Sequence, residues 1–412
     1  MNYQIENGFV CRFIIAYSRQ NTSLSFMPPR CNKFLPLLLL TFLLFCRIKK
    51  ADAQQAFRAK FQDWIEDNDR IRIKSWYFSG EETFNENWKA EIVGLIDSMS
   101  GATPNGIQPQ DSDDWLSQMR ERREAFVGSL TYKKDDYSYS FEFGLSDESD
   151  YVSRSYAASV TKAMWEETLN VTGGLSFMDD RVDTSVFGGP GLGIQTKHTP
   201  DFFLGIERLL DPKTVVSLNF TYGRPDGYLS DPYKGVQYTV EPFPGFEFLK
   251  LASENRPDER ETFIGYLEGK RYFEKLDASI EASYRYFADD RDLVGHTFDL
   301  QWFQRFGDSW VLRPGFRYYI QDAANYYRRT LDGTGIDHDA QIFGQAPYYS
   351  SDYRISELET LTYGLKLTYF TKGNLNIDIA FDKYEMKGLD GVTSQLLYPD
   401  AKVYTVGLQL VY

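Results

Sequence analysis

Apolar and polar residues alternate along most of the chain with a period of two, which is the period of a β-strand. The alternation is clear in segments of about 8 to 12 residues, such as 137–145 (YSYSFEFGL), 215–222 (VVSLNFTY) and 278–287 (ASIEASYRYF). This length suits a tilted strand that crosses a membrane in about 9 to 11 residues. The pattern therefore predicts an all-β protein whose strands are apolar on one face only.

The links between these segments alternate in length. Short links such as 133–136 (KKDD) and 371–374 (TKGN) join segments into hairpins, and longer links at 178–200, 224–260, 322–357 and 383–401 separate the hairpins. Short turns at one rim and long loops at the other are typical of an outer-membrane barrel. We count fifteen segments, and an even number is required. One strand is therefore missed or wrongly counted, and the places where this is expected are before Gly106 and within 234–250. The prediction is a single transmembrane antiparallel up-and-down β-barrel of 14–16 strands over residues 70–412.

The last segment is apolar on one face up to its final residue. This face is formed by Tyr404, Val406, Leu408, Leu410 and Tyr412. In a closed barrel the last strand must pair with the first, because an open edge in lipid leaves backbone groups without partners. A terminal aromatic strand also resembles the signal that the outer-membrane barrel insertion machinery reads. We therefore expect these five residues to be needed for assembly.

The beginning of the chain indicates export. Residues 34–45 (FLPLLLLTFLLF) are too few for a membrane helix, follow Arg30 and Lys33, and precede Ala51-Asp52-Ala53, which has small residues where a signal peptidase cuts. We assign residues 1–53 to a leader with a signal peptide, for which a start at Met27 gives a more usual length. Cys46 raises lipidation as an alternative, but the preceding residue is a phenylalanine where that signal needs a small one. Residues 54–69 are expected to form a short periplasmic segment with helical spacing, and 111–124 a second helix.

Composition and charge exclude several classes of protein. Aromatic residues make up 16% of a chain whose mean hydropathy is −0.44, which fits tyrosine and tryptophan girdles at two membrane interfaces. The formal net charge of −14 becomes more negative once the basic leader is removed, so no nucleic-acid partner is expected. All three cysteines, Cys11, Cys31 and Cys46, lie in the leader, so the exported chain has no disulfide and no cysteine metal site.

Few residues suggest chemistry. Asp337-His338-Asp339 resembles part of a metal site, but a lone motif in a glycine-rich loop is more typical of a turn. His296, which follows Asp289, Asp290 and Asp292, raises the alternative of a hydrolase at the barrel rim, although no G-x-S-x-G motif accompanies it. We therefore predict no catalytic residue, cofactor or metal. The acidic runs 147–150, 179–180 and 289–292 are interpreted as solvated loop ends, with attraction of cations as the functional alternative.

Five stretches together resemble a bacterial outer-membrane barrel family that is filed only as a domain of unknown function. These are Ser100-Gly101-Ala102-Thr103-Pro104, Glu254-Asn255-Arg256-Pro257-Asp258, residues 284–290 (YRYFADD) with His296-Thr297, Arg317-Tyr318-Tyr319, and Ser351-Asp352-Tyr353-Arg354. The resemblance extends from about Ile71 to Tyr412. It implies a barrel in the outer membrane of a Gram-negative bacterium, in contact with outer-membrane lipid, and it brings no known activity.

The residues expected to face inward indicate a wet interior. Ser138, Ser140 and Glu142 alternate with aromatic residues, as do Asn219 and Thr221. The sequence therefore favours a porin-like channel or transporter of unknown substrate, with loops 224–260 and 322–357 constricting or covering its mouth. Two alternatives stay open: a scaffold barrel that docks a periplasmic or surface partner, and the rim-site hydrolase.

Overall fold

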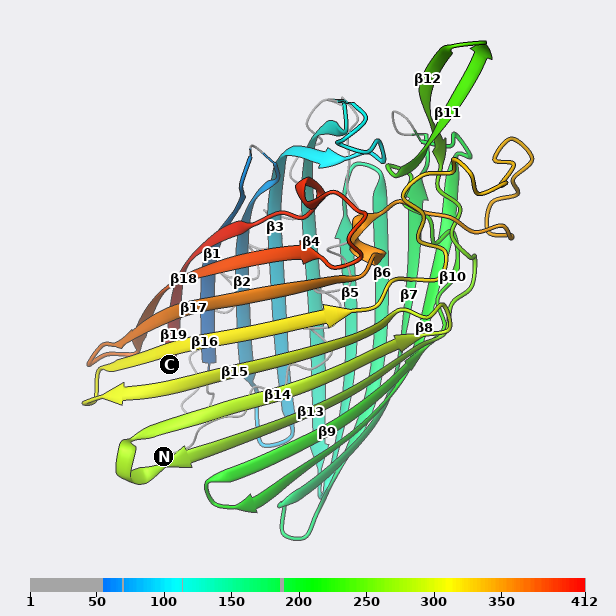
Figure 1. The fold of residues 1–412 in the computed structure, drawn as a ribbon. Helices are drawn as coiled ribbons and strands as arrows, with labels where there is room; N and C mark the ends of the chain where they lie inside the picture. Colours follow the sequence, from blue (N-terminus) through cyan, green and yellow to red (C-terminus); the bar gives the residue numbers. More distant parts are fainter. Residues whose placement is uncertain (1–54, 69, 113, 186–188, 412) are drawn as a thin grey trace.

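The computed structural model describes residues 55–68, 70–112, 114–185 and 189–411. Sixteen antiparallel strands form one closed ring in which each strand pairs with its neighbours in the sequence and the last strand pairs with the first (Figure 1). The strands of the ring are β1 (Gln55–Glu66), β2 (Arg72–Thr83), β3 (Trp88–Pro104), β4 (Leu116–Lys134), β5 (Tyr137–Asp147), β6 (Tyr151–Met164), β7 (Leu169–Asp183), β8 (Ile194–Asp211), β9 (Thr214–Gly223), β13 (Thr262–Phe273), β14 (Ala278–Asp289), β15 (Val294–Phe306), β16 (Trp310–Gln321), β17 (Leu358–Phe370), β18 (Leu375–Gly388) and β19 (Ala401–Val411). Further elements are β10 (Asp226–Gly227), the hairpin β11 (Gly235–Phe243) and β12 (Phe246–Ser253), and the 3-10 helices η2 (Glu274–Leu276), η3 (Tyr353–Ile355) and η4 (Gln395–Leu397).

The predicted fold class and strand number are confirmed, and the missing strand is β1. The expected helix within 54–69 is wrong, because residues 55–66 pair with β2 on one side and with β19 on the other. Phe61 lies opposite Val406 in this seam. The segment carries both apolar and charged residues because its two faces meet lipid and lumen, and this alternation was mistaken for helical spacing. The region 234–250 forms the hairpin β11–β12, outside the ring. The proposed leader, residues 1–53, lies outside the described residues.

The two rims differ as the link lengths predict, although several strands are longer than expected. Links at one end are turns such as 135–136 and 371–374, whereas residues 224–261 and 322–357 form long loops at the other end (Figure 1). The expected helix at 111–124 is wrong: β4 begins at Leu116, with exposed Arg120 and Arg122 alternating with buried Glu121. The link expected at 178–200 is also shorter, because β7 extends to Asp183 and β8 begins at Ile194. Strands that rise above the membrane meet water on their outer face, so charged residues replace the apolar ones there.

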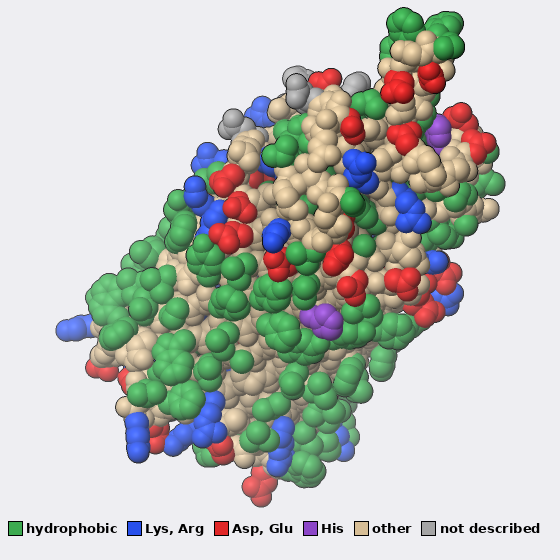
Figure 2. Space-filling view, viewed as in Figure 1, with side chains coloured by type: hydrophobic (Ala, Val, Ile, Leu, Met, Phe, Trp, Pro, Cys, Tyr) green, Lys and Arg blue, Asp and Glu red, His purple; other side chains and the backbone are tan. Residues whose placement is uncertain are grey.

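The outer wall of the barrel is apolar. Apolar side chains on five different strands are each 45 to 55% exposed; these are Phe141, Phe202, Leu300, Leu365 and Val406. Figure 2 shows hydrophobic side chains over the wall between two zones where charged side chains gather. In the part of the chain that the structure describes, no helix is long and apolar enough to cross a membrane.

Aromatic pairs lie on the outer face near both rims. Trp88 packs on Tyr132 and Trp310 on Tyr369 near the short turns, with ring centroids 4.6 and 4.5 Å apart. Tyr222 packs on Phe263 near the long loops, 5.1 Å apart. Adjacent aromatic residues in the sequence cannot both join a girdle, since neighbouring side chains on a strand point to opposite faces. The doublets Tyr318-Tyr319 and Tyr369-Phe370 are therefore divided between lipid and lumen.

The lumen is lined by polar and small side chains. Ser138, Ser140 and Glu142 alternate with exposed aromatic residues of β5, and the Thr131 and Ser140 hydroxyls lie 2.6 Å apart across the β4–β5 pair. Asn219 of β9 is buried between exposed Leu218 and Phe220. These inward positions are as the sequence predicts.

Candidate functional site

Three loops meet over one end of the barrel and form what we call the cap: residues 105–115, 224–261 and 322–357. The links that hold them are separated around the ring by six, four and six strands. The Gly235 amide donates to the Asn105 carbonyl at 2.9 Å, and the Ser351 hydroxyl donates to the Gly235 carbonyl at 2.7 Å. Loops rooted so far apart can touch only by crossing the opening. The cap therefore lies across the mouth, as expected for loops 224–260 and 322–357.

Backbone geometry fixes the first of these contacts. Gly106 has a φ of +115°, and a Cβ added there would lie 1.9 Å from the Gly235 carbonyl oxygen. Only glycine allows two segments of the backbone to approach so closely. Gln108 completes the junction, since its backbone N–H donates to the Gln237 side chain at 2.8 Å and its own side chain donates to the Arg329 carbonyl at 3.0 Å.

A small apolar core holds the two long loops together. It is formed by Val236, Ala252, Leu331 and Tyr349, of which Val236 and Tyr349 are fully buried. Asn255 is also fully buried, and its side chain donates to the carbonyls of Gln345 and Pro347 and accepts from the Gly344 amide. A buried amide with these partners satisfies its hydrogen-bonding capacity within the cap.

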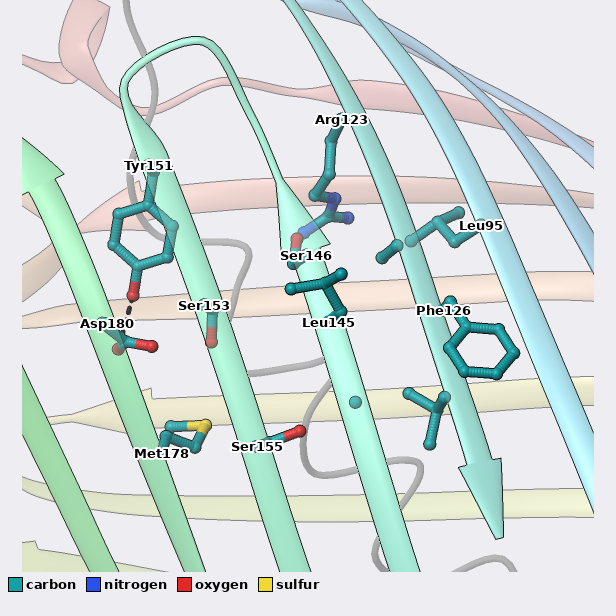
Figure 3. A pocket seen from close by; sticks show the side chains of 13 residues that line it. Leu95, Arg123, Phe126, Leu145, Ser146, Tyr151, Ser153, Ser155, Met178 and Asp180 are labelled. Carbon is teal, nitrogen blue, oxygen red and sulfur yellow. Dashed lines mark hydrogen bonds between the residues drawn. The ribbon is translucent and has the colours of Figure 1, made fainter. Parts of the chain in front are cut away.

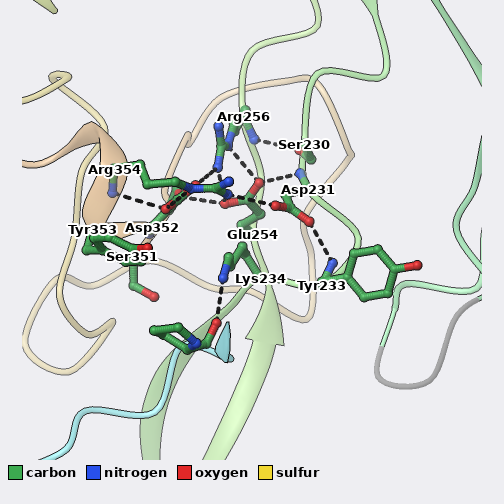
Figure 4. A network of polar contacts seen from close by, with 12 residues as sticks. Ser230, Asp231, Tyr233, Lys234, Glu254, Arg256, Ser351, Asp352, Tyr353 and Arg354 are labelled. Carbon is green, nitrogen blue, oxygen red and sulfur yellow. Dashed lines mark hydrogen bonds and ion pairs between the residues drawn. The ribbon is translucent and has the colours of Figure 1, made fainter. Parts of the chain in front are cut away.

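A network of charged side chains lies beside this core (Figure 4). Arg354 contacts Asp352 at 2.6 Å and Asp231 at 2.9 Å, and Arg256 contacts Asp352 at 2.8 Å and Glu254 at 2.6 Å. Burial opposes ionisation of Asp352, but Arg354 and Arg256 outweigh it and hold the pKa of that carboxyl well below its usual range. Opposite charges are thus matched within the cap, as buried ions require.

Lys234 connects this network to the barrel wall. Its ammonium donates to the Pro104 carbonyl at 2.5 Å and to the Thr103 hydroxyl at 3.2 Å, at the end of β3. Burial, followed by the nearby Arg354, lowers the pKa of Lys234 to about 8. Three stretches that carry the family resemblance therefore come together here: 254–258 and 351–354 within the cap, and 100–104 at the end of β3, which the cap contacts. The resemblance was the sequence signal for these positions, whereas Asp231, Lys234 and Gln108 had none.

The acidic run at 147–150 is part of the site and not a solvated loop end. Glu148 is 5% exposed, and the Asp150 carboxylate accepts a hydrogen bond from the Tyr233 hydroxyl of the cap. Burial raises the pKa of Glu148 to about 8 and that of Asp150 to about 7. Asp180 is likewise buried, at 1% exposure. The solvated interpretation is wrong for these residues because the strands extend past the membrane and the cap covers their ends.

A pocket lies on the luminal wall below this point (Figure 3). Ser153, Ser155 and Asp180 contribute polar groups to it, and Met178 and Val127 contribute apolar surface. The Tyr151 hydroxyl donates to one Asp180 oxygen at 2.6 Å. The lining of the pocket therefore combines apolar side chains with a few hydrogen-bonding groups.

His296 lies on the outer face of β15, within the aromatic girdle. Its Nδ1 is 2.8 Å from the Tyr284 hydroxyl, and its ring packs against Tyr284 and Tyr286. Asp289 instead accepts from the amides of the 290–293 turn and pairs with Arg260. Among the described contacts of His296 there is no carboxylate that would orient it as a general base.

The other two histidines occupy different places. His198 lies at the rim between Asp226 and Asp179, and His338 packs on Tyr238 of β11 with ring centroids 3.9 Å apart. Asp337 accepts a hydrogen bond from the Asp339 amide, as in a turn. Within the described ranges, no group of three or more His, Cys, Asp or Glu residues is arranged to hold a metal ion.

The C-terminal residues singled out in the sequence lie on the lipid-facing side of β19. Tyr404, Val406 and Leu408 are each 46 to 47% exposed, and Leu410 shares their face by alternation. Tyr412 lies outside the described residues.

Comparison with known proteins identifies the family. Residues 112–410 match the family described as "Protein of unknown function (DUF3570)". The chain belongs to this family. No curated protein matches the chain.

Solved structures with a similar fold are outer-membrane proteins. One is the siderophore receptor PirA from Pseudomonas aeruginosa, with a TM-score of 0.42 and 11% identity over 88% of this chain and 62% of that one. Another is OmpT of Vibrio cholerae, with a TM-score of 0.39 and 9% identity over 89% and 100% of the two chains. A bacterial polysaccharide outer membrane secretin has a TM-score of 0.45 and 6% identity over 87% and 98%. The chain thus spans less than two thirds of the length of PirA.

Proposed function

We propose that the protein is a porin-like channel of the outer membrane that passes small solutes through its lumen, with the cap limiting their passage. The observation that carries this proposal is a closed ring of sixteen strands, polar inside and apolar outside, with three loops across one mouth. A ring of this size is wide enough for an aqueous passage, unlike an eight-stranded barrel that side chains fill.

The location follows from the same features. The apolar wall with aromatic pairs at both rims suits a bilayer, and short turns and long loops suit periplasmic and external ends respectively. The leader at residues 1–53 would bring the chain to the periplasm, from which the insertion machinery would assemble it. The proposal places the cap on the outer surface of the cell.

Planar-bilayer recording tests the channel. Purified protein should give discrete conductance steps, and a variant with residues 228–257 and 325–352 replaced by short glycine-serine turns should give larger ones. Both proteins must first show heat-modifiable migration, which reports a folded barrel. Absence of steps from both folded proteins would reject the channel.

The hairpin β11–β12 favours a second candidate, a barrel that docks a surface partner. It projects beyond the other loops (Figure 1), and Phe243, Phe246 and Phe248 on it are each more than half exposed. Exposed aromatic side chains in water are a common mark of interaction sites. Replacing the three phenylalanines with serine should leave conductance unchanged if the protein is a channel alone, and should release a surface partner if docking is its role.

A further inference from the structure

The luminal wall formed by β3 to β8 carries carboxylates whose hydrogen-bond partners are neutral. Asp201 accepts from the Ser176 hydroxyl at 3.3 Å, and Glu207 accepts from Asn170 and Ser217, each at 3.4 Å. In contrast, Arg123 and Lys197 on the same wall already pair with their own carboxylates, those of Asp97 and Asp180. This wall therefore has an excess of acidic groups.

Small side chains leave room beside these carboxylates. Glu142, Ala157, Ser176 and Asp201 occupy one row across β5, β6, β7 and β8, each opposite the next. Strands are spaced by about 4.8 Å, so the Cα atoms of Glu142 and Asp201 are separated by roughly 14 Å along the wall. The two side chains between them are too short to fill the space above the row.

Several buried oxygens on this wall have no partner within the described structure. They include Asp180 Oδ1, which lies in the pocket of Figure 3, together with Thr199 Oγ1 and Glu142 Oε1. Asp180 and Thr199 are 1% and 2% exposed. A carboxylate oxygen left in this state is an acceptor that a cation or a donor group would satisfy.

The opposite wall is mainly basic, although Asp299 of β15 lies on it directly across from Arg317. Arg285, Arg313 and Arg317 point inward from β14 and β16, and Arg313 lies directly across from Lys366 of β17. In the sixteen-strand ring, β14 to β16 lie across from β3 to β5. Charges of opposite sign on facing walls produce a field across the lumen that separates cations from anions.

We propose that small cations cross the lumen along the β3–β8 wall, from the pocket at Asp180 past the row that holds Glu142 and Asp201. This inference rests on the proposed channel function and adds its substrate class, which is cationic solutes. The carboxylates attract the cation, and the small side chains between them leave space for its hydration shell.

Zero-current potentials across a planar bilayer with a KCl gradient test the route. The wild-type channel should prefer K⁺ over Cl⁻, and the double variant Glu142→Gln, Asp201→Asn should lower that permeability ratio by about threefold or more, towards unity. The matched control is Asp299→Asn, which removes a luminal carboxylate from β15 on the opposite wall. It should change the ratio far less.

The outcomes separate this inference from the proposed function. Conductance steps with no preference for K⁺, or a ratio unchanged in the folded double variant, would overturn the cation route while leaving a channel. An equal loss of selectivity in the Asp299→Asn control would show that the route does not follow the β3–β8 wall. Absence of any steps would overturn both.

Discussion

The Tyr233 hydroxyl donates a hydrogen bond to the Asp150 carboxylate, and so joins the cap to the link between β5 and β6. Burial and then Glu121 raise the pKa of Asp150 to about 7, and Asp231 and Asp183 add to the effect. Burial also raises the pKa of the neighbouring Glu148 to about 8, although Arg123 opposes this shift. Acidic groups from four segments, β4, the β5–β6 link, β7 and the cap, therefore face one another where the cap is attached.

This contact should make the attachment of the cap weaker at high pH. A carboxyl whose pKa is raised in the folded state binds more protons there than in the unfolded state, so stability falls as pH rises from the ordinary pKa to the raised one and then levels off. We expect amide exchange of residues 228–235, corrected for its intrinsic pH dependence, to accelerate between about pH 4 and 8. Asp150→Asn should flatten this response, and Tyr233→Phe should accelerate exchange even at about pH 4, the low end of this window. A wild-type rate independent of pH would contradict the expectation.

Arg354 should be needed to keep the cap in place. It contacts both Asp231 and Asp352, which are 3% and 1% exposed at their side chains, and its loss leaves two buried carboxylates short of a partner. Breaking such a pair costs on the order of 3 kcal/mol. Arg354→Ala should therefore expose the cap to proteinase K in vesicles while the barrel core stays resistant.

The control for that variant is Arg224→Ala. Arg224 pairs with Glu259, but both side chains are about half exposed, so water screens the pair and it should contribute little to stability. Equal protection of the cap in wild type and Arg354→Ala would show that the network does not hold it.

Neighbouring residues on β15 should tolerate charge very differently. Leu300 is 45% exposed on the outer wall, whereas Gln301 points into the lumen. Leu300→Arg should destabilise the barrel by about 2 to 4 kcal/mol if it lies near the bilayer midplane, and Gln301→Arg should cost far less. Urea unfolding in lipid vesicles, followed by tryptophan fluorescence, measures both. Similar losses would mean that the inner and outer faces are wrongly assigned.

The C-terminal strand should decide whether the barrel assembles. β19 pairs with β18 and also closes the ring on β1, so shortening it disturbs two seams. We expect deletion of residues 410–412 to leave the chain degraded or retained in the periplasm. Heat-modifiable barrel at wild-type levels in outer-membrane fractions of the mutant would refute this, and Lys402→Ala, on the same strand near the other end, serves as the control.

Sequence alone determined the barrel because its cause is local and repetitive. Alternation at period two assigns each side chain to lipid or lumen, as at Ser140 beside Phe141, and the alternating link lengths assign the two rims. The same logic failed where the outer environment changes from lipid to water. There the upper part of β4 lost its apolar face and was taken for a helix. β1 keeps an apolar face, and it was taken for a helix because its alternation was mistaken for helical spacing.

The cap was decided only by the tertiary structure. Asn105, Lys234 and Ser351 lie far apart in the sequence, and nothing in their local pattern shows that the loops holding them meet. Ring closure sets which loops can reach one another, because it fixes the positions of their roots around the rim. Burial then turns acidic runs that look like solvated loop ends into buried groups such as Glu148 and Asp180. Periodicity therefore fixed the wall of this protein, while contacts between distant segments determined what lies across its mouth.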